Sequence, residues 1–386
     1  MKHQKHAKLT RPNYGFFARN EWAIIGTTCG DIQQLAQRLT AVFSAKCKVA
    51  YVDADHKSAD DTANAPQNSA FAAGAQLEYT DKIGYHRFDT KEQYDVWQFR
   101  QAFNETDFLI VNGNHFKAKK QVVVIDERKK ESLSRKLDRL TDVDLILLKN
   151  ADDTIYDFLQ AHLATVNAIP MLLWDDFDGI VSFFEKALAA AKPVLNGLVL
   201  AGGKSQRMGH DKGLITYYQK PQQEHVYELI DAFCDTTFLS IRTDQTLDND
   251  LATIKDAFVG LGPFGAILSA FKEYPNHAWL VVACDLPLLN EASISTLLEN
   301  RNPSKIATAF LNPATGFPDP LVTIWEPKSY PILYQFLAQG YSCPRKVLIN
   351  SDIELVDLPD PSILKNVNNP EELEEARRAI KKGFSK

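Results

Sequence analysis

The stretch Val194-Leu-Asn-Gly-Leu-Val-Leu200, followed by Ala201-Gly-Gly-Lys-Ser-Gln-Arg-Met-Gly-His-Asp-Lys212, decides the fold of the C-terminal half of this chain. Its first part is apolar and has the length of a buried strand. Ala201, Gly202 and Gly203 follow at once, and larger side chains there would keep a base and a triphosphate away from the backbone. Backbone N–H groups in such a loop suit anions, so the stretch predicts a strand that ends in a nucleotide-binding loop.

Two cations complete the same stretch. Arg207 and Lys212 lie five residues apart and can hold a triphosphate from two sides, arginine by its planar fork and lysine as a point charge. A glycine-rich turn with solvated charges is the alternative, but the strand context that the motif requires is present. We therefore expect Arg207 and Lys212 to be catalytic. The expected nucleotide-binding residues of the stretch are Leu200, Ala201, Gly202, Gly203, Ser205 and Lys212.

A second apolar run, Trp279-Leu-Val-Val-Ala283, reads as another buried strand with Asp285 just beyond its end. Open α/β sheets bind ligands at the carboxyl ends of their strands. Mg²⁺ prefers a carboxylate together with phosphate oxygens of the substrate. The position therefore predicts a catalytic, Mg²⁺-binding role for Asp285, with a helix N-cap before Pro287 as the alternative.

The N-terminal half predicts an α/β sheet domain of its own. Apolar residues between Asp31 and Ser44 share one helical face, and strand-like runs stand on either side of that helix. Residues 56–76 are small and polar, which is typical of a loop. The predicted strands are 22–25, 48–52, 108–112, 122–125, 145–148 and 171–174, and the later helices are 91–103, 155–165 and 180–191.

Length and composition bound the remaining possibilities. A chain of 386 residues is too long for one ordinary core, and we expect a flexible arm (1–20), a first domain (21–192) and a second domain (193–386) divided at Pro193. The net charge of −6 disfavours nucleic-acid binding. Five scattered cysteines and the lack of an apolar run of roughly 18 residues favour a cytoplasmic protein that does not bind a membrane.

The glycine-rich stretch resembles the signature LAGGxSxRMGxDK of molybdenum cofactor guanylyltransferases, the MobA-like branch of the NTP-transferase fold. Three further stretches within roughly residues 195–380 are similar to this family. Leu261–Ala266 resembles its GPLAG loop, with Asp256 shortly before it. Ala283–Leu288 resembles CDxPF, and Asn366–Leu373 resembles NxNTPEDL. The resemblance implies a Rossmann-like nucleotidyltransferase sheet.

The resemblance also implies roles for residues outside the first stretch. Asp256 would contact the nucleotide, Asn366 and Asn368 would bind the acceptor, and Asn368 would join Asp285 on Mg²⁺. Asn366 and Asn368 are equally typical of turns. The chain departs from the family at three places: Arg242 stands near the position of an asparagine, Gln219 replaces the glycine of GKP, and Gly265 precedes the family's second glycine, which is Ala266 here.

The implied activity is transfer of GMP from GTP to molybdopterin with release of pyrophosphate. Gly202-Gly203 matches the GTP-using branch, whereas the CTP-using branch carries Ala-Ala at this place. Two alternatives stay open at the level of sequence. One is the same chemistry with CTP or with a sugar or polyol phosphate as the acceptor. The other is a non-catalytic molybdopterin carrier or scaffold, and molybdoenzymes or cofactor-synthesis proteins are the expected protein partners.

The segment Ile24-Ile-Gly-Thr-Thr-Cys-Gly-Asp31 stands where a P-loop would, and the N-terminal half resembles the MobB-like GTPase-fold domain. A functional P-loop needs GxxxxGK[ST], but Asp31 and Ile32 replace the lysine and the hydroxyl residue. We therefore expect a degenerate P-loop-like domain that binds or docks without hydrolysing GTP. We interpret Asp31 as a helix N-cap. A metal site is one reading of Asp53, Asp55 and His56, but a pair of carboxylates at a strand end is more typical of a solvated turn.

Overall fold

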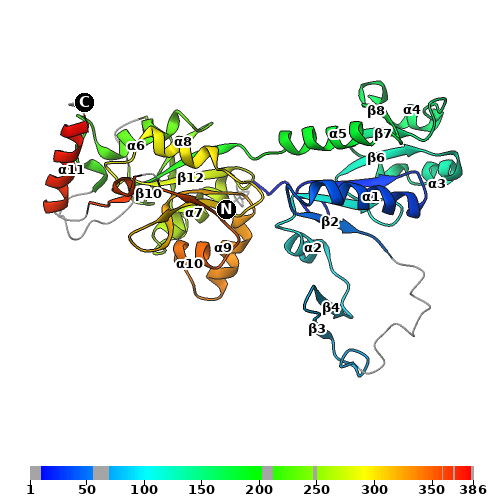
Figure 1. Cartoon of the computed structure of the whole chain (residues 1–386), viewed down its shortest axis with the longest axis horizontal. Helices are drawn as coiled ribbons and strands as arrows, with labels where there is room; N and C mark the ends of the chain where they lie inside the picture. The colour runs from blue at the N-terminus through cyan, green and yellow to red at the C-terminus, as the bar shows by residue number, and fades with distance from the viewer. Residues whose placement is uncertain are drawn as a thin grey trace, which may run out of the picture. The chain divides into compact units, whose positions relative to one another are not determined.

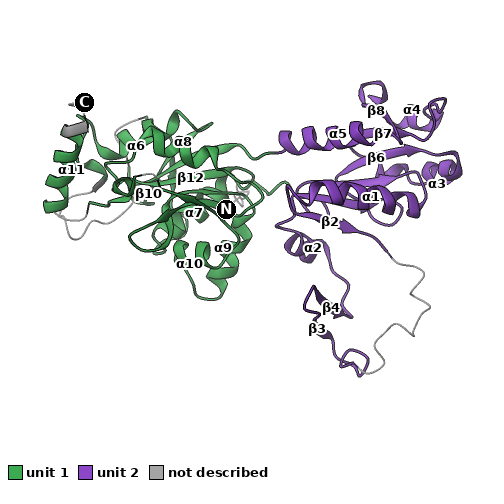
Figure 2. Ribbon diagram, in the orientation of Figure 1, with its two compact units in different colours: residues 1–13, 192–386 green, residues 14–191 purple. Residues whose placement is uncertain are grey.

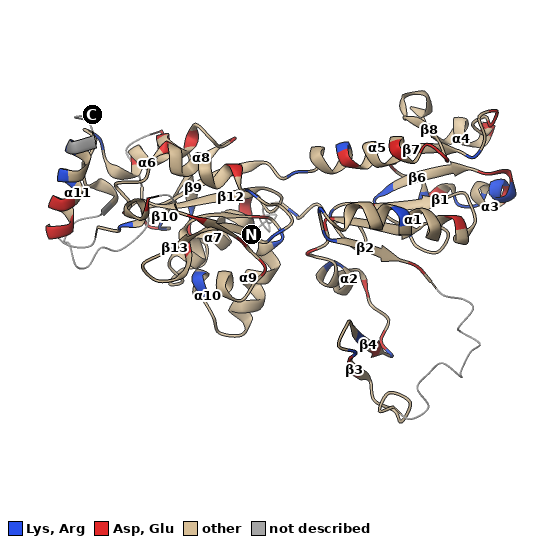
Figure 3. Ribbon diagram, viewed as in Figure 1, with Lys and Arg blue, Asp and Glu red and all other residues tan. Residues whose placement is uncertain are grey.

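A computed structural model describes residues 10–54, 69–201, 212–246, 250–358, 360–367 and 370–383. The chain forms two compact units, one of residues 14–191 and the other of residues 1–13 and 192–386 (Figures 1 and 2). Each unit is built on a largely parallel sheet, so the predicted α/β class is confirmed. Lys and Arg are interspersed with Asp and Glu over both units (Figure 3).

The sheet of the N-terminal unit has six parallel strands in the order β2-β5-β1-β6-β7-β8. The buried strands at its centre are almost wholly apolar, which is typical of a sheet that is covered on both faces. All six predicted strands are present. Their bounds are β1 (Glu21–Ile25), β2 (Val49–Val52), β5 (Phe108–Asn112), β6 (Lys120–Ile125), β7 (Val143–Leu148) and β8 (Met171–Leu173).

Helices cover both faces of this sheet. On one face α1 (Cys29–Phe43) and α5 (Phe177–Ala190) bury their apolar sides, with Trp22 and Phe108 beneath them. Two predicted helices are shorter than the sequence indicated, and Asp95 forms a capping box that starts α2 later than expected. The other helices are α2 (Val96–Ala102), α3 (Lys130–Ser134), α4 (Asp157–His162), η1 (Glu127–Lys129), η2 (Leu137–Arg139) and η3 (Val166–Ala168).

Two features of this unit differ from the sequence-based prediction. Residues 14–20 do not form part of a flexible arm, because Phe17 and Ala18 are buried and the buried carboxylate of Glu21 accepts the N–H groups of residues 16–18. The strands β3 (Leu77–Asp81) and β4 (His86–Thr90) form a separate antiparallel hairpin that the sequence did not predict. Several of its large apolar side chains are exposed, so it lacks the burial pattern from which strands are predicted.

The C-terminal unit has a seven-stranded sheet in the order β11-β10-β9-β12-β14-β13-β15. Strands β11, β10, β9 and β12 are parallel to one another, β14 runs antiparallel to β12, and β13 is antiparallel to β14. The bounds are β9 (Leu195–Leu200), β10 (Thr237–Ile241), β11 (Thr253–Lys255), β12 (Ala278–Ala283), β13 (Ala307–Asn312), β14 (Phe317–Trp325) and β15 (Glu354–Asp357).

Two apolar clusters enclose this sheet. One packs α6 (Gln222–Asp231) and α8 (Glu291–Glu299) on one face, and the other packs α7 (Pro263–Glu273), α9 (Ser329–Ala338) and α10 (Pro344–Ile349) on the opposite face. The remaining helices are α11 (Pro370–Gly383), η4 (Lys212–Leu214) and η5 (Pro361–Leu364). Because four neighbouring strands are parallel, their carboxyl ends share one edge of the sheet, where ligands bind in such folds.

Candidate nucleotide-binding site

The predicted phosphate loop leaves the sheet at its centre. Strand β9 is fully paired with β12, and Leu200 lies opposite Ala283 in the register. Ala201, which comes next, is buried. Gly202, Gly203, Ser205 and Arg207 lie outside the described residues, as does the Lys212 side chain, although the Lys212 backbone begins η4. The described structure therefore places the start of the loop at the ligand-binding edge.

Asp285 lies beside that point, beyond the carboxyl end of β12. It does not cap the following helix, because α8 begins at Glu291 and Asn290 provides the cap. Its backbone carbonyl accepts a hydrogen bond from the Val367 N–H at 3.1 Å. This bond brings the half-buried Asn366 next to Asp285 although 81 residues separate them in sequence. The structure thus joins two of the predicted elements, and Asn368 lies outside the described residues.

Residues that the sequence did not single out lie next to the segment that follows Asp285. The Tyr218 hydroxyl donates to the Pro287 carbonyl at 2.6 Å, and Gln222 Nε2 lies 3.4 Å from the Leu286 carbonyl. Burial raises the pKa of the neighbouring Tyr217 to about 12, with Arg377 opposing the shift and Asp285 adding to it. The contributions of Arg377 and Asp285 place both charges near this phenol. No motif marks Tyr217, and only tertiary structure reveals it.

Asp256 follows the edge strand β11 at the same edge of the sheet, and its carboxylate holds the adjoining loop. Its Oδ1 accepts from the Phe258 N–H at 2.8 Å and lies 3.1 Å from Ser269 Oγ. A methyl group on Gly265 would stand 2.4 Å from the Phe258 carbonyl, so the glycine permits this close approach. Asp256 also lines a hollow of about 520 Å³ outside β11 that does not include Asp285.

The departure at Gln219 has a visible backbone consequence. Gln219 is exposed and has a φ of +64°, in the left-handed region that glycine adopts without strain. The chain accepts this conformation in the turn where Thr216 and Pro221 form an isolated bridge. The other departure, Arg242, follows β10, and its Nε pairs with Asp244 Oδ1 at 3.2 Å.

Replacing Gln219 by glycine is expected to stabilise the C-terminal unit by about 0.5–1 kcal/mol, because the left-handed strain disappears and outweighs the added freedom of the unfolded chain. Chemical denaturation of the full chain with urea measures this change. Gln339→Gly is the matched control, since Gln339 has a φ of −94° and should lose stability instead. Equal effects of the two substitutions would contradict the assignment of strain to Gln219.

The donor atoms near Asp285 fit Mg²⁺. Mg²⁺ in nucleotide sites takes one or two carboxylates and completes its shell with phosphate oxygens and water. The carboxylate of Asp285 is a hard oxygen donor of that kind. Within the described residues no group of three or more His, Cys, Asp or Glu side chains could hold a metal by itself.

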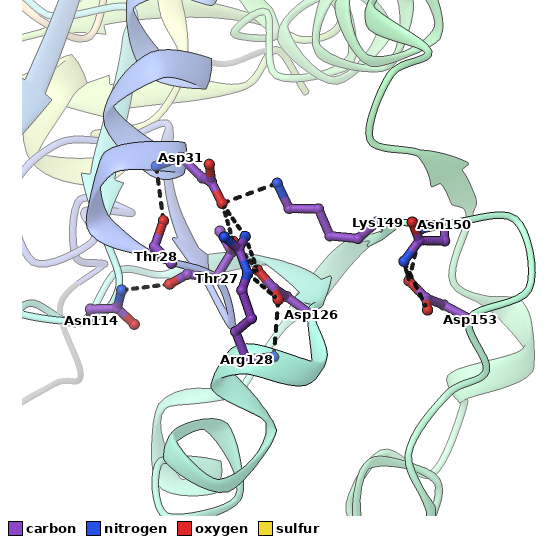
Figure 4. A network of polar contacts seen from close by, with 9 residues as sticks. All are labelled: Thr27, Thr28, Asp31, Asn114, Asp126, Arg128, Lys149, Asn150 and Asp153. Carbon is purple, nitrogen blue, oxygen red and sulfur yellow. Dashed lines mark hydrogen bonds and ion pairs between the residues drawn. The ribbon is translucent and has the colours of Figure 1, made fainter.

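In the N-terminal unit, a charge network occupies the position of a P-loop (Figure 4). Asp31 Oδ2 contacts the Arg128 guanidinium at 2.6 Å and Lys149 Nζ at 3.1 Å, and Asp126 Oδ2 lies 2.6 Å from both Arg128 and the Thr27 hydroxyl. Burial raises the pKa of Asp31, but hydrogen bonds from Lys149, Thr27 and Arg128 outweigh it and lower the pKa to about 2. Two carboxylates and two cations therefore neutralise one another at this position.

The predicted N-cap role of Asp31 is wrong. The cap of α1 is Thr28, whose hydroxyl accepts from the Asp31 N–H at 3.2 Å. Asp31 lies in the first turn, where a carboxylate is also favoured by the helix dipole. The loop retains a sharp turn at Gly26, with a φ of +95°.

Comparison with known proteins identifies the class of the C-terminal unit. Residues 197–353 match the MobA-like NTP transferase domain. A molybdenum cofactor guanylyltransferase of Pseudomonas putida is 30% identical over 198 residues, which are 48% of this chain and 98% of the relative. The chain therefore belongs to the MobA-like NTP transferase family, and it is a nucleotidyltransferase.

Other similar proteins cover parts of the chain. A molybdenum cofactor biosynthesis bifunctional protein of Synechocystis is 35% identical over 181 residues, 46% of this chain, and the chain spans about half (52%) of that relative. A solved molybdopterin-guanine dinucleotide biosynthesis protein A of Archaeoglobus fulgidus is 20% identical, with a TM-score of 0.43, over 48% of this chain and 99% of its own. Bacillus subtilis MobB is 17% identical, with a TM-score of 0.30, over 42% and 97%.

In the part of the chain that the structure describes, no helix is both long enough and apolar enough to span a bilayer.

Proposed function

We propose that this chain transfers GMP from GTP to molybdopterin and releases pyrophosphate. The observation that carries the proposal is the pairing of β9 with β12, which sets Leu200, where the glycine-rich stretch begins, opposite Ala283 at the carboxyl edge of the sheet, just before Asp285. The Val367–Asp285 hydrogen bond brings the stretch that contains Asn366 to the same edge. Similarity to guanylyltransferases along nearly their whole length supports the choice of GTP and of the pterin acceptor.

In this proposal the guanine base lies against the strand end at Leu200–Gly203, and Arg207 and Lys212 hold the triphosphate. The terminal phosphate of molybdopterin attacks the α-phosphorus in line, and the bond to the β-phosphate oxygen breaks as pyrophosphate leaves. The attacking phosphate is already an anion, so no strong general base is needed. Positioning the two anions and neutralising their charge provide the rate enhancement.

Asp285 would hold Mg²⁺, with Asn368 as a further ligand and Asn366 near the acceptor. A bound Mg²⁺ supplies positive charge that offsets the charge on the phosphate oxygens. Asp285 itself fixes the place of that charge, because its backbone is held between β12 and Val367. The half-buried Tyr217 stays protonated at neutral pH and helps to exclude water beside Asp285.

Release of pyrophosphate measured with each NTP and molybdopterin tests the proposal. We expect turnover with GTP, Mg²⁺ and molybdopterin together, and loss of turnover when EDTA removes the metal. Turnover with CTP in place of GTP, or with sugar or polyol phosphates in place of the pterin, would redirect the assignment within nucleotidyl transfer. Tight pterin binding without pyrophosphate release from any NTP would support a carrier instead.

The N-terminal unit is expected not to hydrolyse GTP. Its P-loop position presents Asp31, a carboxylate that repels phosphate, and Arg128 and Lys149 are already engaged by carboxylates. Incubation of the full chain with GTP and Mg²⁺ but no acceptor should release inorganic phosphate no faster than buffer. Because the transferase releases pyrophosphate, the two activities are distinguishable in one reaction. Phosphate release that disappears in Arg128→Ala would contradict the prediction.

A further inference from the structure

A second group of polar side chains lies at the carboxyl edge of the N-terminal sheet. It comprises Cys29 at the start of α1, Asp53 after β2 and His115 after β5. Cys29 Sγ lies 3.3 Å from His115 Nε2, and the same nitrogen lies 3.9 Å from Asp53 Oδ1. Three loops far apart in sequence thus bring together a thiol, an imidazole and a carboxylate. A thiol in contact with an imidazole is the nucleophile–base pair found in covalent catalysis.

The carboxylate in this group is held in place. Tyr51 donates its hydroxyl proton to Asp53 Oδ2 at 2.6 Å, and the Ala54 N–H donates to Oδ1 at 2.8 Å. Burial raises the pKa of Tyr51, and Asp53 raises it further, so the phenol remains a donor. The predicted solvated turn at Asp53 is therefore replaced by an ordered contact. The ordered carboxylate lies 3.9 Å from His115 Nε2.

The thiol stands at the start of a helix, beside polar side chains. Cys29 is exposed and begins the 15-residue helix α1, whose free N–H groups and dipole stabilise negative charge. Asn114 Nδ2 lies 3.5 Å from the sulfur and donates to the Thr27 carbonyl at 2.9 Å. Lys136 Nζ donates to the Asn114 carbonyl, which brings another positive charge to the loop. Such partly exposed, electropositive surroundings are those of reactive cysteines.

We propose that Cys29 is a nucleophilic thiol that undergoes exchange with small-molecule disulfides, with His115 as its activating partner. The Cys29 thiolate attacks one sulfur of a disulfide RSSR, a new S–S bond to Cys29 forms, and the original S–S bond breaks. The Cys29 sulfur is oxidised to the disulfide level, and the leaving sulfur is reduced to RS⁻, which takes the imidazolium proton or one from water. This thiol chemistry is separate from nucleotidyl transfer and does not depend on the proposed function.

A metal centre would be the other use of a cysteine, a histidine and an aspartate. Among the described residues no such group has the geometry of a metal site. In this cluster both the sulfur and the carboxylate contact the same ring nitrogen, which would have to be deprotonated to bind a metal. The contacts instead place Nε2 between the sulfur and the carboxylate.

The test is reaction of the full chain with oxidised glutathione, with the adduct on each cysteine quantified by peptide mass spectrometry over time. Cys343, an exposed thiol of the other unit, is the internal reference. We expect Cys29 to react at least about tenfold faster than Cys343. His115→Asn should bring the Cys29 rate down to that of Cys343 and leave Cys343 unchanged. His162→Asn is the control, because that ring contacts the Leu140 carbonyl instead, at 3.2 Å.

Equal rates at Cys29 and Cys343 in the unmodified chain would overturn the proposal. So would a Cys29 rate that His115→Asn leaves unchanged while circular dichroism shows a folded protein. If His115→Asn fails to fold, Asp53→Asn takes its place, and a Cys29 rate unchanged in that variant would also overturn the role of the cluster. Because transfer of GMP is not measured in any of these reactions, their failure is independent of the proposed function.

Discussion

Asp285→Asn is expected to lower the rate of GMP transfer by about 10²–10³-fold, which corresponds to about 3–4 kcal/mol of transition-state stabilisation. The amide keeps the size of the carboxylate, so the backbone position set by β12 and Val367 should persist. It is a much weaker ligand for a hard cation, because it carries no charge. The Mg²⁺ concentration needed for half-maximal rate should rise together with the loss of rate.

Steady-state pyrophosphate release over a Mg²⁺ titration measures both effects. Asp235→Asn is the matched control, since Asp235 is an exposed aspartate that precedes β10 at the opposite, amino edge of the same sheet. It should keep both the rate and the Mg²⁺ dependence. A folded Asp285→Asn protein with normal turnover and normal Mg²⁺ dependence would remove Asp285 from the site.

Lys212→Ala is expected to lower the rate of transfer by about 10²–10³-fold while the fold survives. The lysine ends the glycine-rich stretch, and its backbone begins η4, where the chain returns from the loop to the described structure. A lost charge-assisted contact at the reacting phosphates costs about 3–4 kcal/mol in the transition state, or about 10²–10³-fold in rate. Because the contact is expected to be strongest as charge moves onto the leaving pyrophosphate, kcat should fall more than KM rises.

The measurement is a comparison of kcat and KM for GTP, with thermal unfolding as the check on folding. Lys305→Ala is the control, because Lys305 lies before the amino end of β13, at the opposite edge of the sheet, and pairs with Asp352 at 2.6 Å. It should leave kcat within about twofold, as expected for a substitution remote from the reacting phosphates. A Lys212→Ala protein that changes only KM would show that the lysine binds substrate without contributing to catalysis.

The apolar runs that predicted the strands were reliable for strands that are buried. The run before Ala201 became β9 and the run ending at Ala283 became β12, because a strand buried on both faces must be continuously apolar. The same logic failed for the β3–β4 hairpin, whose aromatic residues Tyr79 and Phe88 are exposed rather than buried. It also failed for residues 14–20, whose backbone is ordered because its N–H groups donate hydrogen bonds to the buried Glu21 carboxylate.

Residue types a few places apart along the chain were enough to predict the class of fold and the position of Asp285 at a strand end. Which distant segments meet depends on the tertiary structure. Three sets of contacts join separate loops. They are the hydrogen bond of Val367 to Asp285, the pairing of Asp31 with Arg128 and Lys149, and the contact of Cys29 with His115. Parallel strands bring such loops to one edge of a sheet, and periodicity along the chain carries no record of which loops those are.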